Sequence, residues 1–341
     1  MLSIDEQYNI IRGPYQLSLD ITNNCNYRCL HCYNSSGENN TANCEMTDTQ
    51  IINLIKEIAE IKPFGICFCG GEPLLKLELI LKCSDILYEG GVKNISMVSN
   101  GYFMTEEVVK RLKEHHVSHI QISLDGANSE TCFDLRQNNK AFEKAINALK
   151  IVTEAGNLSP SVAFCPTKNN IEQFEEVCDI CESIGVSTLR VQPLMIIGRA
   201  NKNLEKIIPS NLQYIELVRK IRKMQIKYAT KDLYIEYGDP LNHIFVAKEN
   251  EFNFTSYSFS IRADGSIAVS PYLPITVGNV KRHSIKEYWN ANFYKVWNLD
   301  VVQKLAKNLN CVENMGAHGN LETWIDKNIE IDIIDDHVFE D

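Results

Sequence analysis

The chain alternates short apolar runs with amphipathic helical patterns over its first two thirds. The apolar runs are short enough to be buried strands, and the segments between them repeat with the period of a helix. This alternation is typical of βα units built around a parallel sheet. Six units are visible, so we expect an α/β protein with a partial (β/α)6 TIM-like barrel. The predicted strands are 16–21, 65–69, 95–98, 119–124, 161–165 and 188–191.

Capping residues mark several helix boundaries. Thr47 and Gln50 form a capping-box pattern in front of an apolar-periodic run, and Thr105 precedes a second helical segment. Two further helices, predicted at 142–155 and 171–184, are each followed directly by a glycine. Glycine is the residue preferred just past a helix, so both ends are well defined by the sequence.

The pattern changes after residue 200. A basic-faced helix is predicted at 211–230, as a surface helix or a connector, and short strands at 258–263 and 266–270 are joined by an Asp-Gly pair typical of a hairpin. A helix is predicted at 284–308, and the acidic last residues either fold against the body or fray. The predicted domains are a barrel at 14–205, a connecting helix at 206–233 and a small α+β C-terminal extension at 234–341.

Composition narrows the class of protein. Of the 341 residues, 44% are hydrophobic and 23% are charged, as in an ordinary folded protein. The net charge of −10 argues against broad electrostatic binding to nucleic acid or to anionic membranes. No apolar run of about 18 residues and no signal-peptide pattern is present. Because the 12 cysteines are scattered along a long chain, we expect a cytoplasmic protein without a disulfide framework.

Three cysteines, Cys25, Cys29 and Cys32, follow the first predicted strand with CxxxCxxC spacing. Thiolates are the usual ligands of iron–sulfur clusters, and three local ligands leave one iron of a [4Fe–4S] cluster open for chemistry. Two other interpretations fit the spacing. Either His31 or Cys44 completes a zinc site, or a ligand from elsewhere completes an electron-transfer cluster.

Three further motifs follow the next three predicted strands. In a barrel, the carboxyl ends of the strands meet at the face where the chemistry of such folds takes place. One motif at such an end would mean little, but four in succession indicate a site. The four are the cysteine motif at 25–32, GGEP at 70–73, SNG at 99–101 and SLDG at 123–126.

These four motifs, in this order, resemble the radical S-adenosylmethionine (SAM) superfamily over roughly residues 14–200, and more weakly over 234–310. The resemblance implies an oxygen-sensitive enzyme whose cofactors are one [4Fe–4S] cluster and SAM. Such an enzyme reductively cleaves SAM at the cluster to make a 5′-deoxyadenosyl radical, which abstracts a hydrogen atom from the substrate. The electron would come from a reductant such as flavodoxin or ferredoxin.

The resemblance also implies roles for individual residues. Cys25, Cys29 and Cys32 would hold the cluster, and Glu72 would face the methionyl ammonium of SAM beside the backbone of Gly70, Gly71 and Pro73. The residues that would bind the rest of SAM are Ser99, Asn100, Ser123 and Asp125 on the ribose or the methionyl part, Arg136 on the carboxylate, Leu194 on the adenine and His31 beside the adenosine. The simpler alternatives are a tight turn at the glycines, capping of the next helix by Ser123 and Asp125, and a surface ion pair at Arg136.

The stretch after the sixth strand narrows the resemblance. Its P-x-x-x-x-G-R-A pattern, which ends at Ala200, is similar to enzymes with a SPASM or twitch extension, many of which are peptide maturases. Such an extension supplies cysteines for auxiliary clusters, but Ser270 stands at one of these positions, and Cys311 is the only cysteine after Cys181. One ligand cannot hold a cluster that needs several. We expect a degenerate extension without an auxiliary cluster.

On the strength of this extension, we expect a maturase that modifies a ribosomally synthesised peptide. Few residues precede the first strand, so we expect no fused leader-peptide-binding domain, and a peptide substrate would need a separate carrier or the C-terminal extension itself. The alternative substrate is a small molecule such as a sugar, a nucleoside or a cofactor precursor, and a remote alternative is a non-catalytic iron–sulfur or zinc protein. Cys165 could donate a hydrogen atom to a substrate radical, as in epimerases of this superfamily, or could be a small buried hydrophobe.

Overall fold

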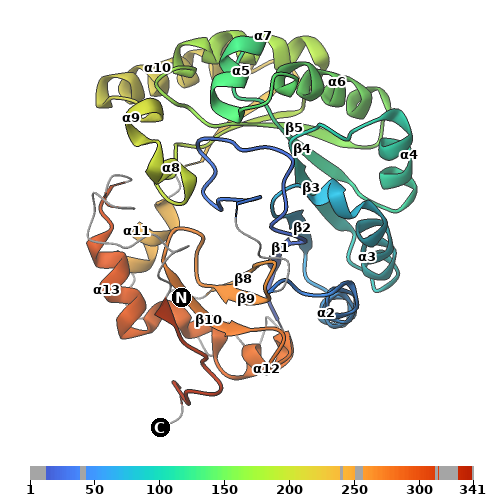
Figure 1. Cartoon of the computed structure of the whole chain (residues 1–341), viewed down its shortest axis with the longest axis vertical. Coiled ribbons are helices and arrows are strands. Elements are labelled where there is room, and N and C mark those ends of the chain that lie inside the picture. The colour runs from blue at the N-terminus through green and yellow to red at the C-terminus, as the bar shows by residue number, and fades with distance from the viewer. Residues whose placement is uncertain are drawn as a thin grey trace. The chain divides into compact units, whose positions relative to one another are not determined.

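The computed structural model describes residues 13–38, 44–238, 241–249, 256–311, 314 and 329–339. The chain forms two compact units, each built from segments that are distant in the sequence (Figure 1). Within the described part of the chain, the first unit comprises residues 13–24, 44–95, 241–249, 256–311, 314 and 329–339, and the second comprises residues 25–38 and 96–238. Both units combine parallel strands with helices, so the protein has the predicted α/β fold.

The sheet of the first unit joins the two ends of the chain. β1 pairs in parallel with β2 on one side and with β8 on the other. In the order of the sheet, its strands are β11 (Ile329–Glu330), β10 (Ile275–Asn279), β9 (Ser266–Ala268), β8 (Ser258–Ile261), β1 (Gln16–Asp20) and β2 (Gly65–Cys69). Its helical segments are α2 (Asp48–Ile61), η1 (Pro73–Lys76), α3 (Leu77–Glu89), α11 (Asn242–Glu249), α12 (Ile285–Asn290), η3 (Phe293–Asn298) and α13 (Asp300–Asn308).

The sheet of the second unit is parallel throughout. In order, its strands are β3 (Asn94–Ser99, of which the last four residues belong to this unit), β4 (His119–Ser123), β5 (Ser159–Phe164), β6 (Thr188–Val191) and β7 (Tyr234–Tyr237). Its helical segments are α4 (Glu106–Glu114), α5 (Ser129–Arg136), α6 (Ala141–Glu154), η2 (Ile171–Gln173), α7 (Phe174–Ile184), α8 (Arg199–Lys202), α9 (Leu204–Ile207) and α10 (Asn211–Lys227).

On β1, β3 and β4, fully buried residues alternate with less buried ones. On β4, Ile120 and Ile122 are fully buried, whereas Gln121 and Ser123 are half-buried on the opposite face. β1 repeats the pattern, with Leu19 fully buried and its neighbours half-buried. Successive side chains of a strand point to opposite faces, so the short apolar runs produce this division directly.

The predicted strands of the barrel agree with the structure to within two residues at each end. The capping box of Thr47 and Gln50 is present at the start of α2, and Thr105 caps α4. Gly156 and Gly185, after α6 and α7, have φ of +60° and +87°. This left-handed backbone explains why a glycine follows each of these helices.

The single helix predicted at 284–308 is wrong. The structure has three short helical segments there, α12, η3 and α13. Asn292 adopts a left-handed backbone with φ of +65°, and Leu299 is extended with φ of −63° and ψ of 132°. Each of these conformations ends a helix, and local apolar periodicity alone does not reveal them.

The basic face of α10 is not simply solvated, because it pairs with the acidic face of α7 (Figure 1). Four lysines spaced along α10 and just beyond it meet four carboxylates spaced along α7 and just before it. The pairs are Lys220–Glu172 at 2.5 Å, Lys223–Glu175 at 2.8 Å, Lys227–Asp179, and Lys231–Glu182 at 2.9 Å. We call this set the α7–α10 ladder.

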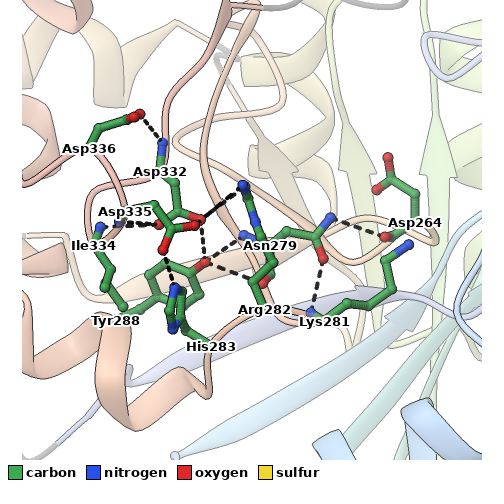
Figure 2. Close-up of polar contacts among 10 residues, drawn as sticks. All are labelled: Asp264, Asn279, Lys281, Arg282, His283, Tyr288, Asp332, Ile334, Asp335 and Asp336. Carbon is green, nitrogen blue, oxygen red and sulfur yellow. Dashed lines mark hydrogen bonds and ion pairs between the residues drawn. The ribbon is translucent and has the colours of Figure 1, made fainter.

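The acidic C-terminal segment folds against the first unit through its carboxylates (Figure 2). Asp332 is 3% exposed, and its carboxylate accepts the Tyr288 hydroxyl at 2.8 Å and pairs with Arg282 at 2.9 Å. Asp335 accepts His283 Nε2 at 2.7 Å. Arg282 also lies 3.5 Å from Asp335, so a guanidinium already supplies the positive charge that these two carboxylates require.

Among the described helices, none combines the length and the apolar character that a bilayer-spanning helix needs.

Candidate cluster and cofactor site

The GGEP segment follows β2 and pairs with the backbone that leads into the cysteine motif. Gly71 N donates to Thr22 O, and Glu72 N donates to Asn24 O, both at 2.8 Å. A Cβ atom on Gly70 would lie 2.3 Å from Thr22 O, and one on Gly71 would lie 2.1 Å from Asn24 O. Gly70 also has φ of +123°, a conformation that favours glycine. Both glycines are therefore required by close backbone packing, beyond the needs of a simple turn.

The carboxylate of Glu72 is fully buried at the start of η1. Its Oε1 accepts the N–H of Leu74 at 3.1 Å, and Pro73 is the first residue of the helix. This cap is a role that the resemblance did not imply.

Glu45 fixes the segment that the GGEP loop pairs with. Its Oε2 accepts the hydroxyl of Thr22 at 2.9 Å, and its Oε1 accepts the N–H of Asn23 at 2.8 Å. Sequence reasoning missed Glu45, because it lies in a loop without a recognisable motif.

The three cysteines lie in the 25–38 loop of the second unit as free thiols. The N–H groups of Tyr27 and Ser36 point at the sulfurs of Cys25 and Cys32, each at 3.4 Å. Donors aimed at sulfur stabilise the thiolate form that a metal requires. Burial raises the pKa of Cys29 to about 12, so this sulfur becomes a thiolate at neutral pH only when a metal replaces its proton.

The donor set fits an iron–sulfur cluster. Three free cysteine thiols lie in one loop of the second unit, and thiolates are the usual ligands of such clusters. The residues that would hold a [4Fe–4S] cluster are Cys25, Cys29 and Cys32.

Arg199 holds the cysteine loop in place from the end of the barrel sequence. Its guanidinium donates to the carbonyl of Cys29 at 3.0 Å and to the carbonyl of Ser36 at 2.6 Å, and it pairs with Glu38. Its backbone N–H donates to Cys32 O at 2.9 Å. With 5% of its surface exposed, Arg199 is a buried cation whose donors serve this loop.

Gly198, the residue before Arg199, allows its own segment to approach the backbone of the cysteine loop closely. Gly198 has φ of +62°, and a Cβ atom there would lie 2.3 Å from Tyr33 O. Gly198 and Arg199 belong to the G-R-A stretch that the sequence offered only as a mark of the branch. That stretch was the available signal for a loop-holding role, but the residues it holds lie about 160 positions earlier in the chain.

Asp125 is the centre of a buried polar group in the second unit. Its carboxylate is fully buried, with Oδ2 2.5 Å from Arg136 Nη2 and 3.5 Å from His31 Nε2, while Oδ1 accepts the N–H of Cys165 at 2.8 Å. Arg136 is 7% exposed, so the alternative of a surface ion pair is wrong. The helix-capping alternative is also wrong, because the N-cap of α5 is Asn128.

Two atoms of this group are placed to meet a ligand. Within the described part of the chain, His31 Nδ1 and Arg136 Nε are buried and have no hydrogen-bond partner. Buried polar atoms are normally paired, so orphaned donors and acceptors point to a bound group. Burial lowers the pKa of His31 to about 4, which keeps the imidazole neutral at physiological pH.

Cys165 lies against the same group and is half-buried. Asn170 Nδ2 donates to the carbonyls of both Asp125 and Cys165, each at 2.9 Å, so the backbone of Cys165 is fixed on two sides. Burial, together with the nearby charge of Asp125, raises the pKa of the Cys165 thiol well above its ordinary value. The S–H bond is therefore retained at neutral pH.

The other predicted cofactor residues have different surroundings. The hydroxyl of Ser99 accepts the N–H of Gly101 at 3.0 Å. The amide of Asn100 donates to Asn26 Oδ1 at 2.8 Å, which links SNG to the cysteine motif. Ser123 lies on the half-buried polar face of β4.

Leu194 belongs to an apolar cluster rather than to an exposed surface. It is 1% exposed. It is packed with Leu135, Ala200 and Ile207, and Leu30 and Cys165 lie against this cluster. Leu194 thus lies near residues of the cysteine loop and near Cys165.

Comparison with known proteins agrees with this arrangement. Residues 19–181 match the model of the Radical SAM superfamily. The chain is 23% identical to the AdoMet-dependent heme synthase of Methanosarcina barkeri over 300 residues, which cover 83% of this chain and 84% of that protein. It is 26% identical to the sporulation killing factor maturation protein SkfB of Bacillus subtilis over 284 residues, or 80% of this chain and 64% of SkfB.

A solved structure shows the same fold at low sequence identity. Streptococcus suis SuiB, in a crystal structure with its precursor peptide SuiA, superposes with a TM-score of 0.66 and 16% identity. The match covers 87% of this chain and 67% of that one. The fold is therefore the partial TIM barrel with an extension, and the cofactors that a radical SAM domain implies are a [4Fe–4S] cluster and SAM. Residues 19–181 of this chain form the radical SAM domain of an enzyme.

Proposed function

We propose that this enzyme is a maturase that modifies a ribosomally synthesised peptide. The observation that carries the proposal is the similarity to SkfB, a maturation protein, and to SuiB, which was crystallised with a precursor peptide. These matches extend over at least 80% of this chain, and so beyond the radical SAM domain. A separate carrier presents the peptide, and a flavodoxin or ferredoxin supplies the electron.

Each part of the candidate site has a role in this proposal. Cys25, Cys29 and Cys32 hold the cluster, which together with SAM supplies the radical chemistry when bound. Gly70, Gly71, Glu72 and Pro73 receive the methionyl end of SAM, with the Glu72 carboxylate facing its ammonium group. The residues that bind the remainder of SAM are His31, Ser99, Asn100, Ser123, Asp125, Arg136 and Leu194.

Asp125 acts in this site mainly by positioning. It holds one nitrogen of Arg136 and leaves Nε for the carboxylate of SAM. The neutral imidazole of His31 has a free Nδ1 that can accept or donate a hydrogen bond to the nucleoside.

Cys165 is the proposed hydrogen-atom donor. Its S–H bond breaks homolytically, the hydrogen atom passes to a carbon-centred substrate radical, and a C–H bond forms. The thiyl radical that remains takes one electron from the external reductant and one proton from solvent, which restores the thiol. Retention of the S–H bond at neutral pH supports this role.

The test begins with anaerobic reconstitution of the full chain. The wild-type protein is expected to bind iron and sulfide and to release 5′-deoxyadenosine from SAM under reductant. Cys29→Ala should lose cluster and SAM cleavage, whereas Cys44→Ala, at an exposed cysteine outside the motif, should retain both. Zinc as the bound metal, or full SAM cleavage by Cys29→Ala, would overturn the assignment of the cluster.

The substrate is tested separately by mass spectrometry. Peptides encoded beside the gene are incubated with the active enzyme, and a mass change or deuterium uptake from heavy water is measured. A small molecule is the second candidate, and the heme synthase match, which covers most of both chains, is the observation in its favour. Active SAM cleavage with no change in any neighbouring peptide, but with turnover of a small molecule, would select that candidate.

A further inference from the structure

α10 presents an apolar and basic stripe to solvent. The exposed fractions of Leu212, Ile215 and Ile226 are 74%, 50% and 79%. Arg219 and Arg222 lie between them along the helix and are also exposed. We call these five residues the outer stripe. Large apolar side chains gathered on one exposed face of a helix are typical of an interaction site.

Helix geometry places the outer stripe on one narrow line. At 3.6 residues per turn, its five residues fall within an arc of about 80° and extend over about 21 Å. The buried residues of α10, Leu217, Ile221 and Met224, lie on the opposite side. The stripe therefore has no role in packing α10 onto its own unit.

The α7–α10 ladder occupies a third side of the helix. Its lysines Lys220 and Lys223 are already paired with carboxylates of α7 and its N-terminal turn. The buried side and the ladder side both contact the second unit, so the outer stripe is the side of α10 that faces solvent.

The spacing of the stripe suits a helix as the partner. Its residues are separated by three and four positions in turn, which is the a/d spacing of a coiled-coil seam. Apolar residues occupy the two ends of the seam and arginines occupy its centre.

The charge of the stripe decides which helix fits. Among the described residues, Arg219 pairs with Glu216 of its own helix and Arg222 has no ion-pair partner. The stripe contains no carboxylate, so in a second copy of this chain the unpaired Arg222 would meet another basic seam. An anionic membrane is disfavoured by the net charge of −10 of the whole chain.

We propose that the outer stripe docks an amphipathic helix of a separate polypeptide, with leucine-like residues at the ends of its seam and carboxylates at its centre. The inference includes no residue of the candidate cofactor site and does not depend on the identity of the substrate.

The experiment measures fluorescence anisotropy of a labelled helical peptide with the reconstituted full chain. The probe is a synthetic peptide of about 14 residues, two heptads, with leucines at the outer seam positions and glutamates at the central ones. Wild-type protein is expected to bind it. Leu212→Lys combined with Ile226→Lys should weaken binding by about tenfold or more. Val246→Lys, at an exposed apolar residue of α11, is the matched control and should leave binding unchanged.

A charge swap tests the central part of the seam. Arg219→Glu combined with Arg222→Glu should lose the glutamate peptide and gain a peptide with lysines at the same positions. SAM cleavage should be unchanged in all these variants, which shows that they remain folded.

Three outcomes would overturn the proposal. Equal affinity of wild type and the Leu212/Ile226 variant would remove the stripe from the binding site. Self-association in sedimentation velocity that this variant abolishes would make the stripe an interface between copies. Binding to vesicles containing phosphatidylserine, with none to the peptide, would assign it to a membrane surface.

Discussion

At the scale of single residues, the cysteine loop depends on a side chain that is not one of its ligands. Arg199 donates to the carbonyls of Cys29 and Ser36 while its backbone N–H donates to Cys32 O. The loop therefore has a defined backbone path fixed by protein contacts. A cluster needs its three ligands in fixed positions, so we propose that Arg199 is a positioning residue for the candidate cluster site.

Replacement of Arg199 by alanine is expected to weaken both fold and cluster. Each buried carbonyl left without its donor costs about 1–3 kcal/mol of unfolding free energy. The iron content after anaerobic desalting should fall, and the midpoint of denaturant unfolding should decrease. Arg219→Ala, which removes a 70% exposed arginine, serves as the control and should change neither quantity. Retention of full iron content by Arg199→Ala would contradict the positioning role.

The Cys165 thiol is expected to resist alkylation at pH 8. Its raised pKa means that the reactive thiolate forms only well above pH 9, so reactivity should rise with pH in that range. Peptide mass spectrometry after iodoacetamide treatment should show Cys44, which is exposed, modified at pH 8 and Cys165 unmodified. Equal labelling of both cysteines at pH 8 would show that the Cys165 thiol is not held in its protonated form.

Much of the candidate site could be predicted from the sequence, because the cysteine triplet and the GGEP motif can each be recognised within a few consecutive residues. The Asp125–Arg136 pair was not readable, because it depends on the position of α5, a helix that the periodicity did not indicate. The resemblance to the radical SAM superfamily implied that Arg136 binds the carboxylate of SAM. The structure adds that its guanidinium is already held by Asp125 at one nitrogen.

At the scale of elements, helix–helix contacts account for features that the sequence left open. The basic face of α10 was visible as a charge pattern, yet nothing local showed that it meets the carboxylates of α7. The two faces are about 48 residues apart in the chain and match pair by pair. A charge pattern identifies a face, whereas its partner is a property of the tertiary structure.

The α7–α10 ladder is expected to act as a set of weak contacts. An exposed ion pair contributes about 0.2–1 kcal/mol, so Lys223→Ala alone should change the unfolding free energy by less than about 1 kcal/mol. Reversing Lys220 and Lys223 to glutamate should lower the melting temperature clearly, because like charges then face each other.

Restoring opposite charges across the ladder should restore the melting temperature that the reversed variant lost. Adding Glu172→Lys and Glu175→Lys to the reversed variant should return most of the melting temperature in a low-salt buffer, as measured by circular dichroism. The difference between the variants should shrink at high salt, where exposed charges are screened. No recovery in the fourfold variant would show that the ladder contributes nothing to the packing of α10.

At the scale of the whole molecule, the first unit cannot be completed by the N-terminal half of the chain. β1 lies between β2 and β8, and β8 comes from the extension. The sequence indicated the hairpin of β8 and β9 but not its parallel neighbour, since a pairing over some 240 residues leaves no local signal. β7 was missed as a member of the barrel sheet for the same reason, although it pairs in parallel with β6.

Truncation after residue 255 is therefore expected to prevent folding. The deletion removes β8 and the buried side chains Phe259 and Ile261 that pack with the first unit. The truncated chain should be insoluble, or should unfold without a cooperative transition in circular dichroism. A soluble 1–255 fragment with cooperative unfolding would show that the rest of the chain folds without the extension.

The close pairing of the GGEP loop with Thr22 and Asn24 also constrains the gene. Glycine codons have the form GGN, so every change at the first or second base introduces a side chain or a stop. At Gly70 and Gly71 that side chain would meet a backbone oxygen at 2.3 Å or 2.1 Å. Two adjacent codons of this gene are thus free to vary only at their third bases, and natural variation there is expected to be silent.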